Sequence, residues 1–217
     1  MELKYKNIVL EGMDGSSKQT QSNRLLERIL DEITNDVSVV SFPDYTTDSG
    51  LLIREYLRNK STTSESLDKI KDDSLLYTIN RFETLKTLKD RDYFETEYTI
   101  FDRYTTSNML YQTLDMSPMH TVQYITWLKN LEYNMLKLPK PDIVFALRVS
   151  PELSKENIKK RGLETDYFET LEVQRKVREH LAYLSEKEGW IIIDVDHKGA
   201  MRSIEDIHDE IFSHLIK

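Results

Sequence analysis

Apolar residues near the start of the chain change from the spacing of a strand to the spacing of a helix. Residues 7–10 (Asn-Ile-Val-Leu) form a short apolar run, and a polar stretch that contains glycine follows. From residue 18 onward, apolar residues recur at helical spacing, as at Leu25, Ile29 and Ile33. The pattern predicts a strand, a loop and a helix, in that order.

The same alternation of strands and helices continues to the end of the chain. Strands are predicted at residues 7–10, 37–42, 98–101, 142–149 and 190–195. Helices are predicted from residue 18 through 33 and at residues 51–57, 74–88, 105–114, 122–136, 171–187 and 204–216. Five strands separated by helices are typical of a parallel sheet with helices on both faces. We therefore predict one three-layer α/β/α domain over residues 1–217.

This fold class indicates where a ligand would bind. In sheets of this kind, ligand sites lie beyond the carboxyl ends of the strands. The segments to inspect are therefore residues 11–20, 42–45 and 102–104, and the residues that follow position 149.

Composition excludes several classes of protein. The formal net charge is −8 and no basic stripe follows a predicted helix, which argues against a nucleic-acid-binding module. The absence of cysteine excludes disulfides, thiolate metal sites and a cysteine nucleophile. The first residues lack the apolar core of a signal peptide, and the longest apolar runs have the length of strands. We expect a cytoplasmic protein with no membrane span.

A loop with phosphate-binding character follows the first predicted strand. Residues 12–20 read Gly-Met-Asp-Gly-Ser-Ser-Lys-Gln-Thr, and Gly12 and Lys18 have the separation of the P-loop pattern. Two positions depart from it, since Ser17 stands where glycine is expected and Gln19 stands where a metal-binding hydroxyl is expected. On this motif alone, a phosphate site and an ordinary strand–turn–helix connection both remain open.

Further motifs resemble one family in their order and spacing. The first is Glu11-Gly12-x-Asp14-Gly15 with Lys18-x-Thr20-Gln21. It is followed by Ser41-Phe42-Pro43, Gly50 with Tyr56-Leu57, the run from Leu75 to Glu83, Asp102-Arg103-Tyr104 with Ser107, Asn108 and Gln112, and Lys160-Arg161-Gly162 with Tyr167. Together these segments resemble the thymidylate kinases, over nearly the whole chain. The resemblance implies a P-loop NTPase fold with a short lid, at about residues 159–170.

The resemblance implies a role for each matched residue. The implied ATP-binding residues are Gly12, Gly15, Ser16, Ser17, Lys18, Gln19 and Thr20. The implied dTMP-binding residues are Asp14, Phe42, Leu57, Tyr77, Arg81, Arg103, Ser107, Asn108, Gln112 and Tyr167. The implied catalytic residues are Lys18, Asp102, Arg103 and Arg161, and the implied metal ligands are Asp102 and Gln19. Tyr77 and Arg81 are one helical turn apart, so they share a face and could stack on a base and bond its edge.

The implied activity is transfer of the γ-phosphate of ATP to dTMP, with Mg²⁺ and without a covalent intermediate. The resemblance also implies a homodimer. Two alternatives remain open: a kinase for another deoxynucleoside monophosphate, and a nucleotide-binding homologue weakened in catalysis by Ser17 and Gln19. We expect an active kinase with weakened binding of metal–ATP.

Overall fold

The computed structural model describes residues 2–59, 67–90, 96–160 and 170–216. The chain divides into two compact units. The first consists of residues 1–40, 96–102 and 141–217, and it contains nearly all of the main sheet. The second consists of residues 41–95 and 103–140 and is helical.

The first unit is built on a five-stranded sheet. Its strands are β1 (Asn7–Gly12), β2 (Val37–Ser41), β3 (Tyr98–Asp102), β4 (Ile143–Arg148) and β5 (Ile191–Asp194). Their order in the sheet is β2-β3-β1-β4-β5. The pairs β1–β3, β1–β4 and β4–β5 are parallel. All five predicted strands are confirmed, and β1 and β4 are buried because strands in the middle of such a sheet are covered on both faces.

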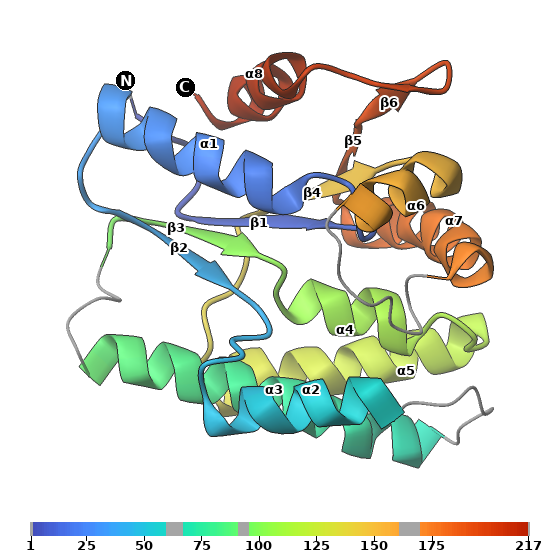
Figure 1. The fold of residues 1–217 in the computed structure, drawn as a ribbon. Coiled ribbons are helices and arrows are strands. Elements are labelled where there is room, and N and C mark those ends of the chain that lie inside the picture. The colour runs from blue at the N-terminus through green and yellow to red at the C-terminus, as the bar shows by residue number, and fades with distance from the viewer. Residues whose placement is uncertain (1, 60–66, 91–95, 161–169, 217) are drawn as a thin grey trace. The chain divides into compact units, whose positions relative to one another are not determined.

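Helices cover both faces of this sheet. The helix α1 (Lys18–Glu32) packs on β1 and β3, and α8 (Ile204–Leu215) packs on α1 and β5. The helix α7 (Leu171–Glu188) contacts β4 and β5. Figure 1 shows α1 and α8 on one side of the sheet and α7 on the other. The predicted three-layer architecture is confirmed.

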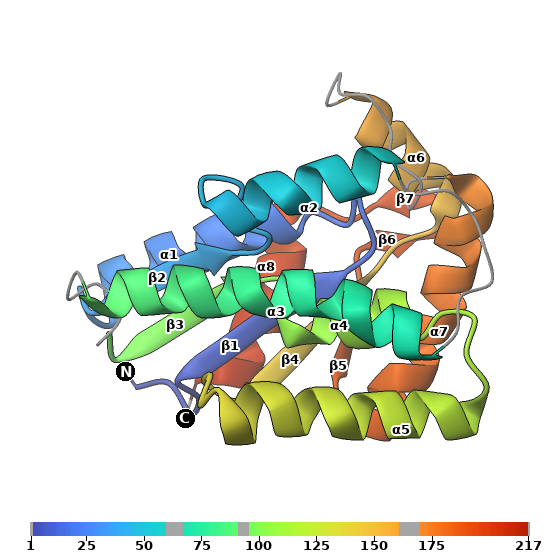
Figure 2. The ribbon, with the colours of Figure 1, turned by 90° about the horizontal axis from the view of Figure 1, so that it is seen from below.

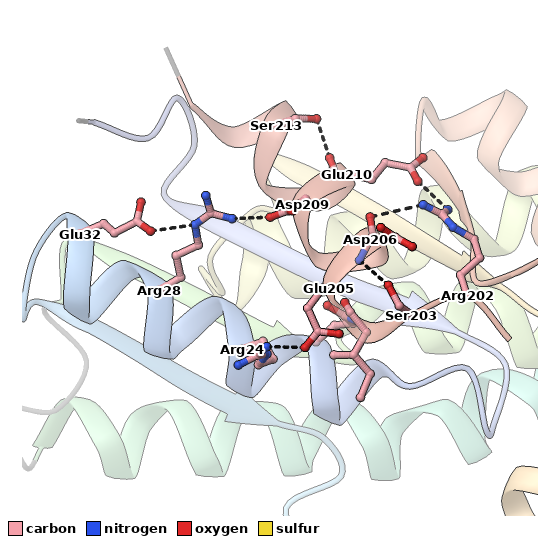
Figure 3. Close-up of polar contacts among 12 residues, drawn as sticks. Arg24, Arg28, Glu32, Arg202, Ser203, Glu205, Asp206, Asp209, Glu210 and Ser213 are labelled. Carbon is pink, nitrogen blue, oxygen red and sulfur yellow. Dashed lines mark hydrogen bonds and ion pairs between the residues drawn. The ribbon is translucent and has the colours of Figure 1, made fainter.

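The contact between α1 and α8 combines ion pairs with apolar burial, and Figure 3 shows the ion pairs. Arg24 bonds Glu205 at 2.7 Å, and Arg28 bonds Asp209 at 2.8 Å. Exposed ion pairs of this kind contribute little, about 0–1 kcal/mol each. The buried apolar side chains that α8 contributes are Ile207, Ile211, Phe212 and Leu215. Apolar burial is therefore the larger part of the attachment of α8 to the unit.

Three elements of the first unit lie outside the predicted set, the helix α6 and the strands β6 and β7. The helix α6 (Pro151–Lys160) has only three buried residues, too few for a clear apolar period. The strands β6 (Asp196–His197) and β7 (Ala200–Met201) form a two-residue hairpin, too short for any period to show. Its turn residues Lys198 and Gly199 both have positive φ, at 50° and 81°, as a two-residue turn of type I′ requires.

The second unit is a helical assembly. It contains α2 (Asp48–Asn59), α3 (Leu67–Asp90), α4 (Thr105–Gln112), α5 (Pro118–Lys129) and the π-helical segment η1 (Asn130–Met135). Figure 2 shows α3 between α2 and α5, and α3 contacts both helices. The single helix predicted at residues 122–136 is therefore two elements. It begins earlier because Ser117 accepts a hydrogen bond from the backbone N–H of His120, and it widens after Lys129.

No helix within the parts of the chain that the structure describes is long and apolar enough to cross a membrane.

Candidate functional site

The phosphate-binding loop connects β1 to α1 in the first unit. Gly12 is the last residue of β1, and Lys18, Gln19 and Thr20 begin α1. Ser17 lies at the N-cap of α1 in the left-handed conformation, with φ 67° and ψ 20°. Its side chain makes no capping hydrogen bond. The P-loop pattern has glycine at this position, and the backbone here has the left-handed conformation that glycine adopts readily, although a serine occupies it.

The side chain of Lys18 folds back over this loop. Its ammonium donates hydrogen bonds to the carbonyl oxygens of Gly12, at 3.0 Å, and Met13, at 2.7 Å. The residue is 7% exposed. If a phosphate were bound, the ammonium could donate to a charged phosphate oxygen in place of a neutral carbonyl oxygen, and that hydrogen bond would be stronger. The ammonium is held where the loop would present it to phosphate.

The loop is held in shape by α6, which the sequence patterns did not predict. Ser154 donates to the carbonyl of Asp14 at 2.6 Å, and Asn157 donates to the carbonyl of Gly15 at 2.9 Å. Gly15 has φ 73°, and a Cβ there would lie 2.6 Å from the carbonyl oxygen of Ser154. Two carbonyls of the loop are thereby bonded to α6, and the close approach requires glycine at position 15.

The other polar side chains of the loop, together with a carboxylate at the end of β3, fit a phosphate ligand with a divalent metal. The hydroxyl of Ser16 is buried and has no hydrogen-bond partner among the residues described, so it can donate to a phosphate oxygen. Gln19 and Thr20 are exposed at the start of α1. Asp102 ends β3, beside β1, with a partly exposed side chain. Carboxylate and amide oxygens suit Mg²⁺, which proteins bind through one or two carboxylates and the phosphates of the substrate.

In the second unit, the segment after β2 is clamped by α3. Asn80 accepts from the backbone N–H of Asp44 at 2.9 Å and donates to its carbonyl at 3.0 Å. Glu83 accepts from the hydroxyl of Ser49 at the start of α2. Phe42, buried in this segment, lies 5.8 Å from the ring of Tyr104. Two residues of the α3 motif thus hold the segment that carries Phe42, a role that the sequence did not indicate.

Arg81, predicted to read the base, lies in a buried polar cluster. Its guanidinium bonds both carboxylate oxygens of Glu132, at 2.9 and 2.5 Å, and the side-chain oxygen of Asn108 at 3.0 Å. Burial opposes the charge on Arg81, but the ion pair with Glu132 outweighs it and the pKa of Arg81 is raised. Tyr77, one turn earlier on α3, is partly exposed, as is Leu57 on α2. Arg81 thus bonds directly to a second predicted residue, Asn108, and to Glu132, which the sequence did not indicate.

Arg103 lies at the junction of β3 and α4. Its φ is 64°, a left-handed conformation that is uncommon for a residue with Cβ and is concentrated at functional sites. Its guanidinium lies 5.5 Å from the ring centre of Tyr111. Ser107 and Gln112 follow on α4, partly exposed and buried respectively. A strained backbone thus fixes the point from which the predicted phosphate-binding arginine emerges.

Two predicted residues, Arg161 and Tyr167, lie outside the described residues, as does most of the predicted lid at residues 159–170.

Comparison with known proteins gives a consistent result over the whole chain. The sequence model of the family described as thymidylate kinase matches residues 10–211. A thymidylate kinase of Plasmodium falciparum is 32% identical over 99% of this chain and 91% of its own length. A probable thymidylate kinase of Pyrococcus horikoshii is 32% identical over 94% of this chain and 92% of its own length. A solved thymidylate kinase of Candida albicans superposes with a TM-score of 0.67 at 27% identity, over 96% of this chain and 90% of that one. The chain therefore belongs to the thymidylate kinase family of nucleoside monophosphate kinases.

Proposed function

We propose that this protein transfers the γ-phosphoryl group of ATP to dTMP, giving dTDP and ADP. The observation that carries the proposal is the loop of residues 12–20, which has P-loop geometry in a chain that belongs to this family. An oxygen of the dTMP phosphate forms the new bond to the γ-phosphorus. The bond from that phosphorus to the oxygen bridging it to the β-phosphate breaks, and that oxygen leaves with ADP.

Residues of the first unit support binding of the phosphate donor. The backbone N–H groups of the loop and the N-terminus of α1 provide fixed partial positive charge for phosphate oxygens. Lys18 would exchange its two carbonyl acceptors for phosphate oxygens and offset their charge. Asp102 and Gln19 would hold Mg²⁺ together with the phosphates of ATP. When bound, Mg²⁺ neutralises charge on the transferring group.

Residues of the second unit support binding of the acceptor. Arg103 is a cation that can fork onto a phosphate, and the backbone at this residue is held in an uncommon conformation. Tyr77 offers an aromatic face for the base, and Arg81 offers hydrogen-bond donors for a carbonyl on its edge. The reaction needs positioning and charge neutralisation and no nucleophile from the protein. Arg161 stays a predicted additional cation, from the segment that would act as a lid.

The proposal is tested by measuring ADP release over a panel of nucleoside monophosphates. dTMP should give the highest kcat/KM of dTMP, dUMP, dCMP, dGMP and AMP. A higher value with another deoxynucleotide would reassign the acceptor. Measurable dTMP binding with negligible ADP release from every acceptor would identify a nucleotide-binding homologue that does not catalyse transfer.

We also propose that the protein is a homodimer that buries an apolar surface of α2 and α3. The exposed apolar side chains on these two helices are Leu51, Leu52, Leu75, Ile79 and Phe82, each 38–55% exposed. Residues 75, 79 and 82 share one face of α3, because they are spaced by four and three positions. Sedimentation should give twice the monomer mass, and Ile79→Glu should shift it to the monomer. Val122→Glu, at an exposed position on α5, is the matched control and should leave the dimer intact.

A further inference from the structure

The carboxylate of Glu132 is completely buried and fully used in hydrogen bonding. It is 0% exposed on the π-helical segment η1. One oxygen accepts from Arg81 at 2.5 Å and from the hydroxyl of Thr78 at 2.7 Å. The other accepts from Arg81 at 2.9 Å and from the hydroxyl of Thr105. A buried carboxylate with four donors has a single orientation, because any rotation would leave donors unpaired.

This carboxylate in turn fixes the guanidinium of Arg81. The Nε and Nη2 groups face Glu132, and Nη2 also donates to Asn108. The contacts come from three elements, since Arg81 lies on α3, Asn108 on α4 and Glu132 on η1. Nη1 is left as the guanidinium nitrogen with no hydrogen-bond partner among the described residues. The cluster therefore presents one defined edge of the arginine.

The free edge can only donate hydrogen bonds. Thymine carries a carbonyl oxygen at C4, which accepts from an N–H group, whereas cytosine carries an amino group there, which donates. A guanidinium has no acceptor, so it cannot pair with the amino group. Discrimination of this kind depends on orientation, because a guanidinium free to turn could avoid the amino group and bond elsewhere.

We propose that Glu132 is a positioning residue, which orients the Nη1 edge of Arg81 toward the C4 carbonyl of the acceptor base and so sets the preference for dTMP over dCMP. This role of Glu132 rests on the proposed function, and it explains how the enzyme would select thymine over cytosine. Glu132 acts through Arg81, and Thr78 and Thr105 hold the carboxylate in place.

The test is steady-state kinetics of Glu132→Gln with dTMP, dCMP and ATP. The amide keeps the shape of the side chain but loses the charge and turns one acceptor into a donor. The KM for dTMP should rise about tenfold, which corresponds to about 1.4 kcal/mol, while the KM for ATP stays within about twofold. The ratio of kcat/KM for dTMP to that for dCMP should fall. A loss of thermal stability with unchanged KM for dTMP and an unchanged ratio would overturn the proposal, because it would mean that the ion pair is only structural.

A milder pair of variants decides the question if Glu132→Gln does not fold. Thr78→Val removes one donor to Glu132, and Thr113→Val removes a buried hydroxyl that donates to the carbonyl of Met109. Thr78→Val should raise the KM for dTMP by about two- to tenfold, the effect of one hydrogen bond, and Thr113→Val should not. Equal KM values for the two variants would overturn the proposal. If the unmodified protein does not phosphorylate dTMP, the proposed function itself fails, and that outcome is distinct from either result with the variants.

Discussion

Replacing Ser17 with glycine tests how the altered phosphate loop affects the protein. Ser17 has φ 67° and ψ 20°, and its side chain makes no capping hydrogen bond, so the substitution removes strain and no cap. A left-handed conformation costs a residue with Cβ roughly 1–2 kcal/mol. Glycine also increases the conformational entropy of the unfolded chain, which lowers the free energy of unfolding by roughly 0.4–1 kcal/mol. The net gain in the free energy of unfolding should be about 0.8 kcal/mol, or about 2–3 °C in Tm for a chain of this length.

The expected effect of the same substitution on ATP follows from the conformation at position 17. Ser17 has the left-handed conformation that a P-loop with glycine at this position adopts, so serine and glycine should present the same loop to phosphate. Ser17→Gly alone should therefore leave the KM for ATP and kcat within about twofold. The increase in kcat/KM for ATP that we predict for Ser17→Gly with Gln19→Thr, roughly tenfold, should come mainly from the hydroxyl at position 19.

The assays are thermal unfolding and ATP kinetics, with Lys198→Gly as the matched control. Lys198 is exposed and also has positive φ, at 50°, in the hairpin of β6 and β7. Both variants should gain stability, and neither should change ATP kinetics. A Ser17→Gly protein no more stable than the parent would refute the argument from strain. A tenfold increase in kcat/KM for ATP from Ser17→Gly alone would contradict the second expectation. It would mean that ATP requires a different backbone conformation at position 17, one that serine resists.

Three further outcomes are expected. Lys18→Ala should weaken ATP binding and Arg103→Ala should weaken dTMP binding in isothermal titration, because they serve different substrates; equal losses of both affinities in both variants would contradict this division. Gln19→Thr should lower the Mg²⁺ concentration needed for half-maximal activity, because a compact hydroxyl replaces a longer amide; an unchanged metal dependence would remove Gln19 from the metal site. Burial, and then the charge of Arg28, lowers the pKa of His208. The unfolded chain therefore takes up a proton at higher pH than the folded protein, so the urea midpoint should fall as pH decreases below about 6.5. His208→Gln should reduce this dependence, and an identical pH profile would contradict it.

The sheet and its flanking helices were predictable because their signals are local. The apolar run at residues 143–147 has the length of a buried strand, and helical spacing identifies a helix by its own residues. The helix α6 was missed because it buries Pro151, Ser154 and Ile158 against its surroundings, and only one of these is strongly apolar. Its role in holding the phosphate loop could not be inferred, since Ser154 and Asp14 are 140 positions apart in the chain.

Glu132 shows a different limit of the sequence. It falls four positions after Leu128, on the buried side of α5 continued into η1, and a carboxylate in such a stripe signals a buried cation nearby. That signal was present in the sequence. The identity of the partner was not, because Arg81 is 51 positions away and is also explained by contact with a ligand. The sequence therefore indicated Arg81 as a candidate for reading the base, but it did not indicate Glu132, which we propose orients Arg81.

The close contact between the phosphate loop and α6 constrains how this protein can evolve. Gly15 has φ 73°, and a Cβ at this position would meet the backbone of Ser154 at 2.6 Å. A mutation that placed a cationic side chain there would have to move a helix, whereas a mutation on an exposed surface need move nothing. A single substitution at this position therefore cannot add positive charge to the loop without displacing backbone. New positive charge for the reaction is more accessible to selection elsewhere in the chain, at positions where a long side chain can be added without displacing backbone.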